Sequence, residues 1–242
     1  MQNIDSADQA RLSLFGTGPH PCAYLTERVA QTQFVDPGAR LSTPRYSALV
    51  QRGFRRSGQY VYRPRCPECS ACQSLRVPVA EFTPRRRHQR CLRRNADLQV
   101  RRAPAHFDEE HFALYRRYVA SRHAGGDMDD PDPHKYMDFL HAPWCDTGFY
   151  EFRAAGRLMA VTVVDELPAG LSAVYTFFDP EASGRGLGTL AILWLMQYSR
   201  RLGLPHVYLG YWIGESPKMA YKADYHPHEI YTRDVWRRVE AP

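Results

Sequence analysis

The sequence predicts an α/β fold in which a mixed sheet is flanked by helices. Three runs rich in β-branched and aromatic residues, at 149–152, 158–164 and 171–178, predict consecutive strands. A long apolar helix is expected at 187–202, and a further strand at 206–212. Strands and helices in this order pack as one sheet with helices on its faces, around a hydrophobic core.

The first hundred residues predict a smaller part built from short elements. Prolines in the first turn favour helices at 43–54 and 84–94. Alternating residues predict strands at 60–62, 75–79 and 98–102. We therefore divide the chain into an N-terminal part, residues 1–103, and a C-terminal part, residues 104–242.

The C-terminal part is expected to hold the sheet and its flanking helices. Beyond the strands and the long helix above, its elements are an amphipathic helix at 108–122, a loop at 125–133, a hairpin turn at 167–170, a short helix capped by Ser216, and a closing strand at 230–239. The boundaries follow from turn and capping residues.

The chain carries an excess of arginine. Lysine and arginine number 32 against 26 acidic residues, which gives a net charge of +6. The only lysines are Lys135, Lys218 and Lys222. Such a surplus is compatible with a polyanionic partner, and equally with a genome whose codons favour arginine. No apolar run is long enough to span a bilayer and the first residues are polar, so a cytoplasmic protein without a membrane partner is expected.

Closely spaced cysteines form the first candidate site. Cys66, Cys69 and Cys72 stand in two successive Cys-x-x-Cys spacings, and Cys22 is the natural fourth ligand once the chain folds. Disulfides are disfavoured in the cytoplasm. We expect these four residues to bind a metal ion, zinc or an iron–sulfur cluster. The alternative is a loop in which cysteine acts as a small apolar side chain.

An arginine-rich helix is the second candidate site. Arg86, Arg90, Arg93 and Arg94 share one face of a helix, and guanidinium groups on one face match a phosphate backbone. Acidic residues are nearly absent between 82 and 94, which argues against a salt-bridged surface helix. The pattern predicts that this face binds nucleic acid; the alternative is a solvated charged surface.

The segment after the last predicted sheet strand is the third candidate. Lys218, Tyr221, Lys222 and Tyr225 are three and four residues apart, so a continuous helix would place them on one face. Lysine charge and tyrosine stacking suit the single-stranded end of a nucleic acid. A core helix with half-buried tyrosines is the alternative that the sequence leaves open.

The loop before the long helix resembles the one with which GNAT-type acetyltransferases cradle the pyrophosphate of coenzyme A. Counting from Arg185, Gly188 fits that motif, but Leu190 occupies its last small position. We expect a leucine there to crowd a pyrophosphate lying on the backbone. The sequence therefore predicts a GNAT-like fold with a damaged coenzyme A signature.

Together these motifs resemble arginyl-tRNA–protein transferases and their bacterial relatives, the aspartate/glutamate leucyltransferases. The segment 208–225 is similar to the hallmark of that family, and 53–58, 75–79 and 93–98 match its earlier motifs in order. The resemblance implies a GNAT-like fold with a Cys-bearing N-terminal part, leucyl-tRNA as donor, and acceptor proteins with N-terminal Asp or Glu. The resemblance also implies that the added leucine marks the acceptor for degradation. Eukaryotic members bind an iron–sulfur cluster through adjacent cysteines, a pattern that this chain lacks.

The implied reaction requires no ATP and no metal, because the ester that joins the amino acid to the tRNA is already activated. The enzyme must position two substrates and stabilise an oxyanion. Our candidate for the oxyanion is the helix start at Ser216, and for proton relay Tyr211 or Tyr221. To recognise the acceptor's carboxylate the site needs a cation, for which Arg56 and Arg76 are the candidates.

Three other functions fit parts of the sequence. The first is arginine transfer by the same mechanism. The second is acetyl transfer from coenzyme A, and the third is RNA binding without catalysis. A transfer assay with several charged tRNAs separates them.

Overall fold

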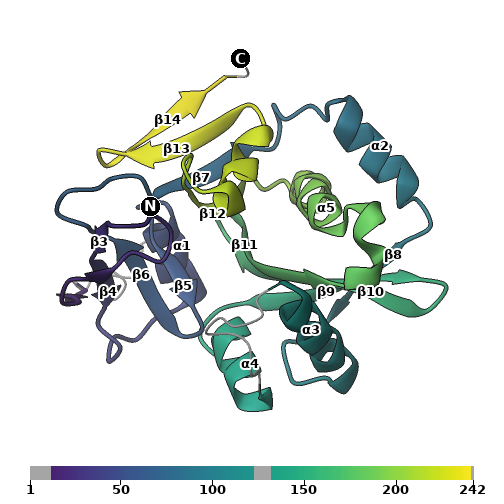
Figure 1. Cartoon of the computed structure of the whole chain (residues 1–242), viewed down its shortest axis with the longest axis horizontal. Coiled ribbons are helices and arrows are strands. Elements are labelled where there is room, and N and C mark those ends of the chain that lie inside the picture. Colours follow the sequence, from purple (N-terminus) through teal and green to yellow (C-terminus); the bar gives the residue numbers. More distant parts are fainter. Residues whose placement is uncertain (1–11, 123–131, 241–242) are drawn as a thin grey trace, which may run out of the picture.

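The protein is described by a computed structural model that covers residues 12–122 and 132–240. Its main sheet has eight strands in the order β14-β13-β7-β12-β11-β10-β9-β8 (Figure 1). In chain order these are β7 (Gln73–Pro78), β8 (Gln99–Ala103), β9 (Thr147–Ala154), β10 (Arg157–Leu167), β11 (Gly170–Phe178), β12 (His206–Trp212), β13 (His228–Thr232) and β14 (Val235–Val239). Among the strands of the described residues, only β11 and β12 pair in parallel, which confirms the predicted mixed sheet.

Helices cover both faces of this sheet. The helix α5 (Leu187–Arg201) packs on one face with α2 (Arg86–Arg94) beside it, and α3 (Glu109–Arg122) and α4 (Pro133–Leu140) cover the other (Figure 1). Alternation along β10 explains the two apolar layers. Ala160 and Val164 face the α5 side, whereas Val161 and Val163 face the α3 side.

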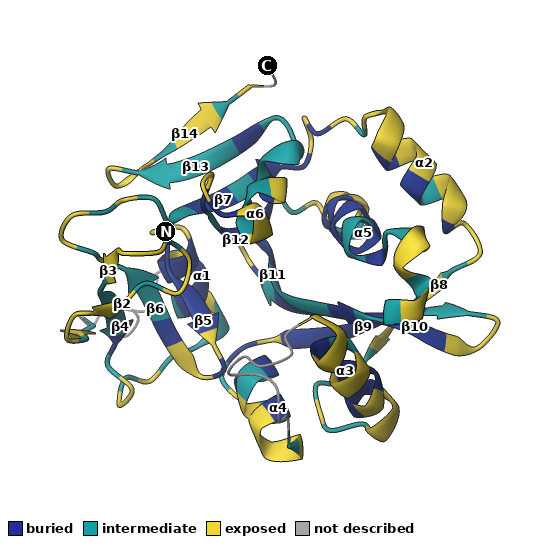
Figure 2. Cartoon of the chain, viewed as in Figure 1, coloured by how far each residue is buried: buried dark blue, intermediate teal, exposed yellow. Residues whose placement is uncertain are grey.

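The N-terminal part forms a second, smaller sheet against one end of the main sheet. Its strands are β1 (Leu14–Gly16), β4 (Thr32–Val35), β6 (Tyr60–Pro64) and β5 (Arg55–Ser57), in that order, with the separate pair β2 (His20–Pro21) and β3 (Val29–Ala30). The helix α1 (Thr43–Val50) packs its buried Tyr46 and Leu49 in one cluster with Leu167 and Tyr208 of the main sheet. Figure 2 shows the resulting buried band along α1 and β5.

The predicted division at residues 103 and 104 does not separate the two sheets. Strand β7 precedes that boundary, yet it lies between β12 and β13 in the main sheet. The two parts of the chain therefore share a sheet. Within the described residues, no helix is long and apolar enough to cross a membrane.

Several element boundaries differ from the prediction for identifiable reasons. Helix α2 begins two residues later than expected, because Arg85 is its N-cap and the backbone N–H of Arg85 meets the His88 ring at 3.3 Å. The predicted closing strand is the hairpin β13–β14, which turns at Arg233 and Asp234, both with positive φ. Helix α4 was not predicted, although Asp132 caps it. The expected loop at 125–133 lies largely outside the described residues.

Candidate active site

The parallel strands β11 and β12 begin side by side and then separate. Only Leu171 with Val207 and Ser172 with Tyr208 are in register. Beyond these pairs β11 continues beside β10, whereas β12 continues beside β7 (Figure 1). Side chains from other elements occupy the place that a neighbouring strand would otherwise take. We call this region the sheet split.

Arg55, from the start of β5, enters the sheet split. Its guanidinium donates to the Ser172 hydroxyl at 3.0 Å and to the backbone carbonyl of Ala173. Gly210 makes this approach feasible, because a Cβ at that position would lie 3.2 Å from the guanidinium carbon of Arg55. The φ of Gly210 is +81°, which also favours glycine.

Lys222 reaches the sheet split from the other side. It belongs to η3 (Tyr221–Asp224), a 3₁₀ turn that follows the short helix α6 (Pro217–Ala220). Its Nζ donates to the Tyr211 carbonyl at 2.6 Å and lies 3.4 Å from the Met219 sulfur. Burial, and secondly the positive charge of Arg55, lower the pKa of Lys222 to about 7.

A pocket of about 310 Å³ opens beside the sheet split, at the start of α5. The lining residues that the chemistry needs are three arginines of α2, two residues of the loop before α5, and one residue in the first turn of α5: Arg87, Arg90, Arg94, Arg185, Gly186 and Thr189. Gly186 is the N-cap of the 15-residue α5, so the unpaired amides and positive dipole of the helix start add to the arginine charge. We call this the arginine pocket; its composition suits a phosphate group.

The segment η3 joins the two sites. Tyr221, Asp224 and Tyr225 line the arginine pocket, while Lys222, between them in sequence, faces the sheet split. A phosphate bound in the arginine pocket would therefore contact the same 3₁₀ turn that carries Lys222. Asp224 also pairs with Arg87 at 2.9 Å, which links η3 to α2.

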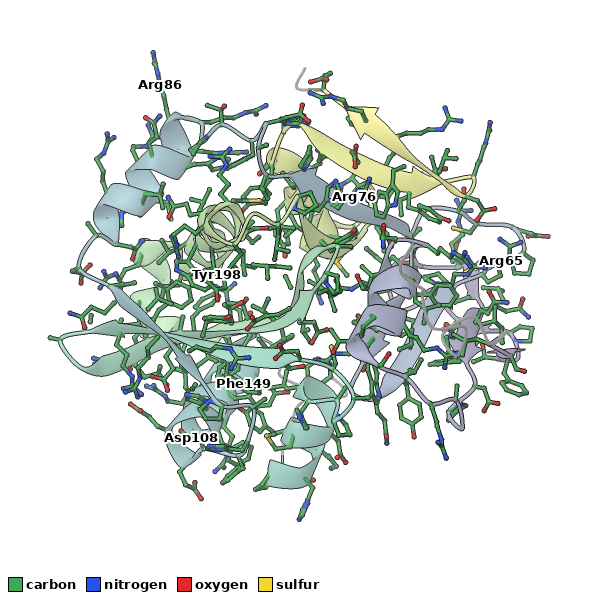
Figure 3. The ribbon with its side chains drawn as sticks, turned by 180° about the vertical axis from the view of Figure 1, so that it is seen from behind. Arg65, Arg76, Arg86, Asp108, Phe149 and Tyr198 are labelled. Carbon is green, nitrogen blue, oxygen red and sulfur yellow. The ribbon has the colours of Figure 1, made fainter. Side chains whose placement is uncertain are left out.

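The predicted arginine face of α2 is rotated in the structure. Arg90 and Arg94 line the arginine pocket, but Arg86 points away from the protein (Figure 3). Arg93 is exposed and does not line the pocket. Arg87 was missed. The signal that identifies it is the buried pair His88 and Cys91, which fixes the inward side of the helix.

The predicted shared face of Lys218, Tyr221, Lys222 and Tyr225 is not formed. The helix changes from α6 to η3 after Ala220, so the spacing of three and four no longer aligns them. Lys218 is exposed, and Tyr221 is 47% exposed at the rim of the arginine pocket. Tyr225 is buried and stacks on His88, with ring centroids 5.3 Å apart.

Leu190 does not crowd the loop before α5, contrary to our expectation. Its side chain is buried in the apolar cluster beneath α5, and it does not line the arginine pocket. Residues in the first turn of a helix point in different directions, and the fourth residue of α5 points to the core. The coenzyme A motif is thus a poor guide to the shape of this loop.

Of the two tyrosines predicted for proton relay, Tyr221 is exposed at the rim of the arginine pocket, whereas Tyr211 is buried and held by structural partners, and the predicted oxyanion site at Ser216 is largely occupied. The Tyr211 hydroxyl lies between the carbonyls of Gly53 and Tyr62, at 3.0 and 3.1 Å, and burial raises its pKa well above 10. Ser216 begins a helix of four residues whose first, Pro217, has no N–H. The amides of Met219 and Ala220 already donate to the Ser216 carbonyl, so this helix start offers little to an oxyanion.

The arginines predicted to bind the acceptor are already paired. Arg56 is buried and donates to both carboxylate oxygens of Asp165, at 2.8 and 2.7 Å. Arg76 pairs with Glu229 at 2.5 Å and stacks 4.2 Å above the Trp236 ring. Each guanidinium therefore already has a carboxylate partner within the chain.

The four predicted metal ligands gather near one another. Burial raises the pKa of the Cys72 thiol to about 12, and charges at Cys22, Cys66 and Cys69 would act on it in the same direction. Cys22 is therefore brought to the Cys-x-x-Cys loop by folding. Within the described part of the chain, however, no three His, Cys, Asp or Glu side chains are arranged to hold a metal ion.

The chain is similar to known proteins over nearly its whole length. Residues 20–90 match the family model described as arginine-tRNA-protein transferase, N terminus, and residues 110–232 match the corresponding C-terminus model. The aspartate/glutamate leucyltransferase of Halorhodospira halophila is 55% identical, and the alignment covers 96% of this chain and 99% of that protein. The protein of the same name from Alkalilimnicola ehrlichii is 51% identical over 95% of this chain and 96% of its own length. The crystal structure of FemX has 8% identity and a TM-score of 0.46 over 83% of this chain and 79% of its own.

Proposed function

The chain belongs to the arginine-tRNA-protein transferase family, and we propose that it transfers leucine from leucyl-tRNA to the N-terminal amine of proteins that begin with Asp or Glu. The observation that carries this proposal is the identity of 50 to 55% to proteins named aspartate/glutamate leucyltransferase, over more than nine-tenths of the chain. The added leucine would mark the acceptor for degradation.

The arginine pocket is our candidate for a phosphate near the 3′ end of the tRNA. Arg90 and Arg94 offer charge-assisted hydrogen bonds, and the start of α5 adds backbone amides. Tyr221 stands exposed at the rim, where an unpaired base can stack on its ring. This arrangement supports an RNA end entering between α2 and η3 with its ester directed toward the sheet split.

The reaction is an aminolysis of the aminoacyl ester. The nitrogen of the acceptor's α-amine bonds to the ester carbonyl carbon, and the bond from that carbon to the ribose oxygen breaks. The ribose hydroxyl then leaves with a proton that the amine releases. Because the ester is an activated acyl donor, the main contribution of the enzyme is to place the neutral amine against the carbonyl in surroundings that exclude water.

The reaction needs no cofactor, but we propose that Cys22, Cys66, Cys69 and Cys72 bind zinc or an iron–sulfur cluster. The proximity of Cys22 to the loop supports this, and ligation would require the thiols to turn toward one centre and lose their protons. Metal analysis and an absorption spectrum of protein purified without oxygen test it. Metal-free protein that is fully stable and active would leave these cysteines a packing role.

The decisive experiment for the function is an acyl-transfer assay. Purified protein is incubated with labelled leucyl-tRNA, arginyl-tRNA or acetyl-coenzyme A, and with peptides whose first residue is Asp, Glu or Ala. We expect label on the Asp and Glu peptides from leucyl-tRNA alone. Arginine transfer without leucine transfer would change the donor, and acetyl transfer would replace the proposal with the coenzyme A-dependent alternative. tRNA binding without any transfer would favour an RNA-binding protein.

A further inference from the structure

Two cations in the sheet split lack a counter-ion. Arg55 is 9% exposed and Lys222 is 8% exposed. Neither forms an ion pair with an Asp or Glu anywhere in residues 12–122 or 132–240. They are also near enough for the charge of Arg55 to lower the pKa of Lys222.

This arrangement costs stability, because a buried charge loses its hydration, and the hydrogen bonds of Arg55 and Lys222 to neutral acceptors compensate for that loss only in part. The neighbouring Arg56 shows how the same strand normally solves the problem. Arg56 is equally buried and is bonded to Asp165, which is itself fully buried. The chain thus supplies a carboxylate for Arg56 and none for the adjacent Arg55.

We propose that Arg55 and Lys222 together bind the side-chain carboxylate of the acceptor's N-terminal Asp or Glu. This inference rests on the proposed leucyl transfer and names the residues that select the acceptor. The remaining N–H groups of Arg55 and of the charged Lys222 supply hydrogen bonds to the two carboxylate oxygens. The sheet split thereby replaces Arg56 and Arg76 as the acceptor site.

The spacing within the acceptor supports this assignment. In an N-terminal Asp, two carbon atoms separate the α-amine from the carboxylate carbon, and in Glu three. An acceptor anchored on Arg55 and Lys222 therefore has its amine within the sheet split, beside η3. The same η3 carries Tyr221 and Asp224 on the arginine pocket, where we place the tRNA end. The two substrates then meet across one short segment.

A carboxylate fits the sheet split better than a phosphate of the tRNA does. The arginine pocket already offers several exposed cations and a helix start, whereas the sheet split offers two buried cations with few spare donors. The low pKa of Lys222 is consistent with an anion site, because a bound carboxylate would favour the charged ammonium and raise that pKa. The other groups against the Lys222 amine, the Tyr211 carbonyl and the Met219 thioether, carry no charge.

The test compares matched acceptor peptides on the full-length enzyme. Transfer of labelled leucine is measured on peptides that begin with Asp and with its uncharged isostere Asn, using wild type, Arg55→Met, Arg55→Lys and Lys222→Met. Arg52→Gln, an exposed arginine three residues from Arg55, is the control. We expect Arg55→Met and Lys222→Met to lower the Asp-to-Asn ratio of kcat/KM at least tenfold, with the KM for leucyl-tRNA within twofold of wild type. Arg55→Lys should retain part of the preference.

Wild-type protein provides a second measurement that does not depend on the folding of a variant. Calorimetry of peptide binding at pH 8, in buffers of different ionisation enthalpy, should show up to one proton more taken up with the Asp peptide than with the Asn peptide, since any proton released by the α-amine is common to both. An unchanged Asp-to-Asn ratio in folded variants, or equal proton uptake for both peptides, would overturn the assignment. Equal loss on both peptides with a raised KM for leucyl-tRNA would assign the cations to the RNA. Absence of leucine transfer by the wild type would instead refute the proposed function itself.

Discussion

The arginine pocket and the sheet split both present cations to an anionic ligand, but the two sites differ in the solvent exposure of those cations. Arg87, Arg90 and Arg94 are exposed on α2, so salt screens them and each contributes mainly by displacing counter-ions. Arg55 and Lys222 are buried, so their attraction for an anion is stronger and less screened. The difference assigns bulk affinity for RNA to the pocket and the selection of one carboxylate to the split.

The largest effect is expected when the three arginines of the arginine pocket are replaced by neutral residues. This tests whether the pocket supplies the affinity for RNA. For Arg87→Gln, Arg90→Gln and Arg94→Gln combined, we expect tRNA binding to weaken by about 10²-fold at 0.1 M salt, and the slope of log affinity against log salt to fall by about 2 to 3. Filter binding across a salt series measures both quantities, with Arg116→Gln on α3 as control. Full affinity with an unchanged slope would place the RNA elsewhere.

A second prediction concerns pH and the sheet split. Lys222 has a pKa of about 7, so it is charged below that pH and loses its proton above it. The Asp-to-Asn ratio of kcat/KM should therefore be constant below about pH 6 and fall up to tenfold per unit above 7. The ratio isolates Lys222 because both peptides carry the same α-amine. In Lys222→Met the residual ratio should not change with pH, and a wild-type ratio that rises with pH would contradict the assignment.

Two single substitutions on α2 sharpen the comparison further. Arg90 lines the pocket and Arg86 points away from it, although both stand on the same helix (Figure 3). Loss of one phosphate contact should weaken tRNA binding by about 5- to 8-fold at 0.1 M salt in Arg90→Gln. We expect less than a twofold effect for Arg86→Gln. Comparable losses in both variants would restore the helix face that the sequence predicted, and a larger loss in Arg86→Gln would place the RNA on the outer side of α2.

The sequence was sufficient for the fold class and for the central strands and helix, because hydrophobic periodicity is local. The strands 158–164 and 171–178, and the helix that the structure places at Leu187–Arg201, were all visible from patterns within single segments. The place of β7 in the main sheet was not, because its partners β12 and β13 lie more than a hundred residues away. Pairing partners at that distance leave no mark on a local pattern.

The site was harder to predict for a related reason. Arg55 and Arg56 are adjacent and chemically identical, and only the fold reveals that Asp165 neutralises one and leaves the other alone. Lys222 and Tyr225 were singled out as part of one motif, but the predicted shared face assumed a continuous helix. The change from α6 to η3 at Ala220 sends Lys222 into the sheet split instead. The sequence showed which residue types the site contains, but it did not show which of the cations have a carboxylate partner in the folded protein.

The smallest expected effect is that of salt on the Asp-to-Asn ratio. It tests directly whether the sheet split is buried from solvent while the arginine pocket is exposed. Raising salt from 0.05 to 0.2 M shortens the Debye length from about 14 to 7 Å, which weakens attraction at the exposed arginines. Transfer at low tRNA concentration should therefore fall severalfold. The Asp-to-Asn ratio, measured at saturating leucyl-tRNA, should change by less than about twofold, because Arg55 and Lys222 are buried and meet the carboxylate at hydrogen-bond distance. If that ratio falls as steeply as tRNA binding does, the carboxylate is read by exposed charges, and the division of labour between pocket and split is lost.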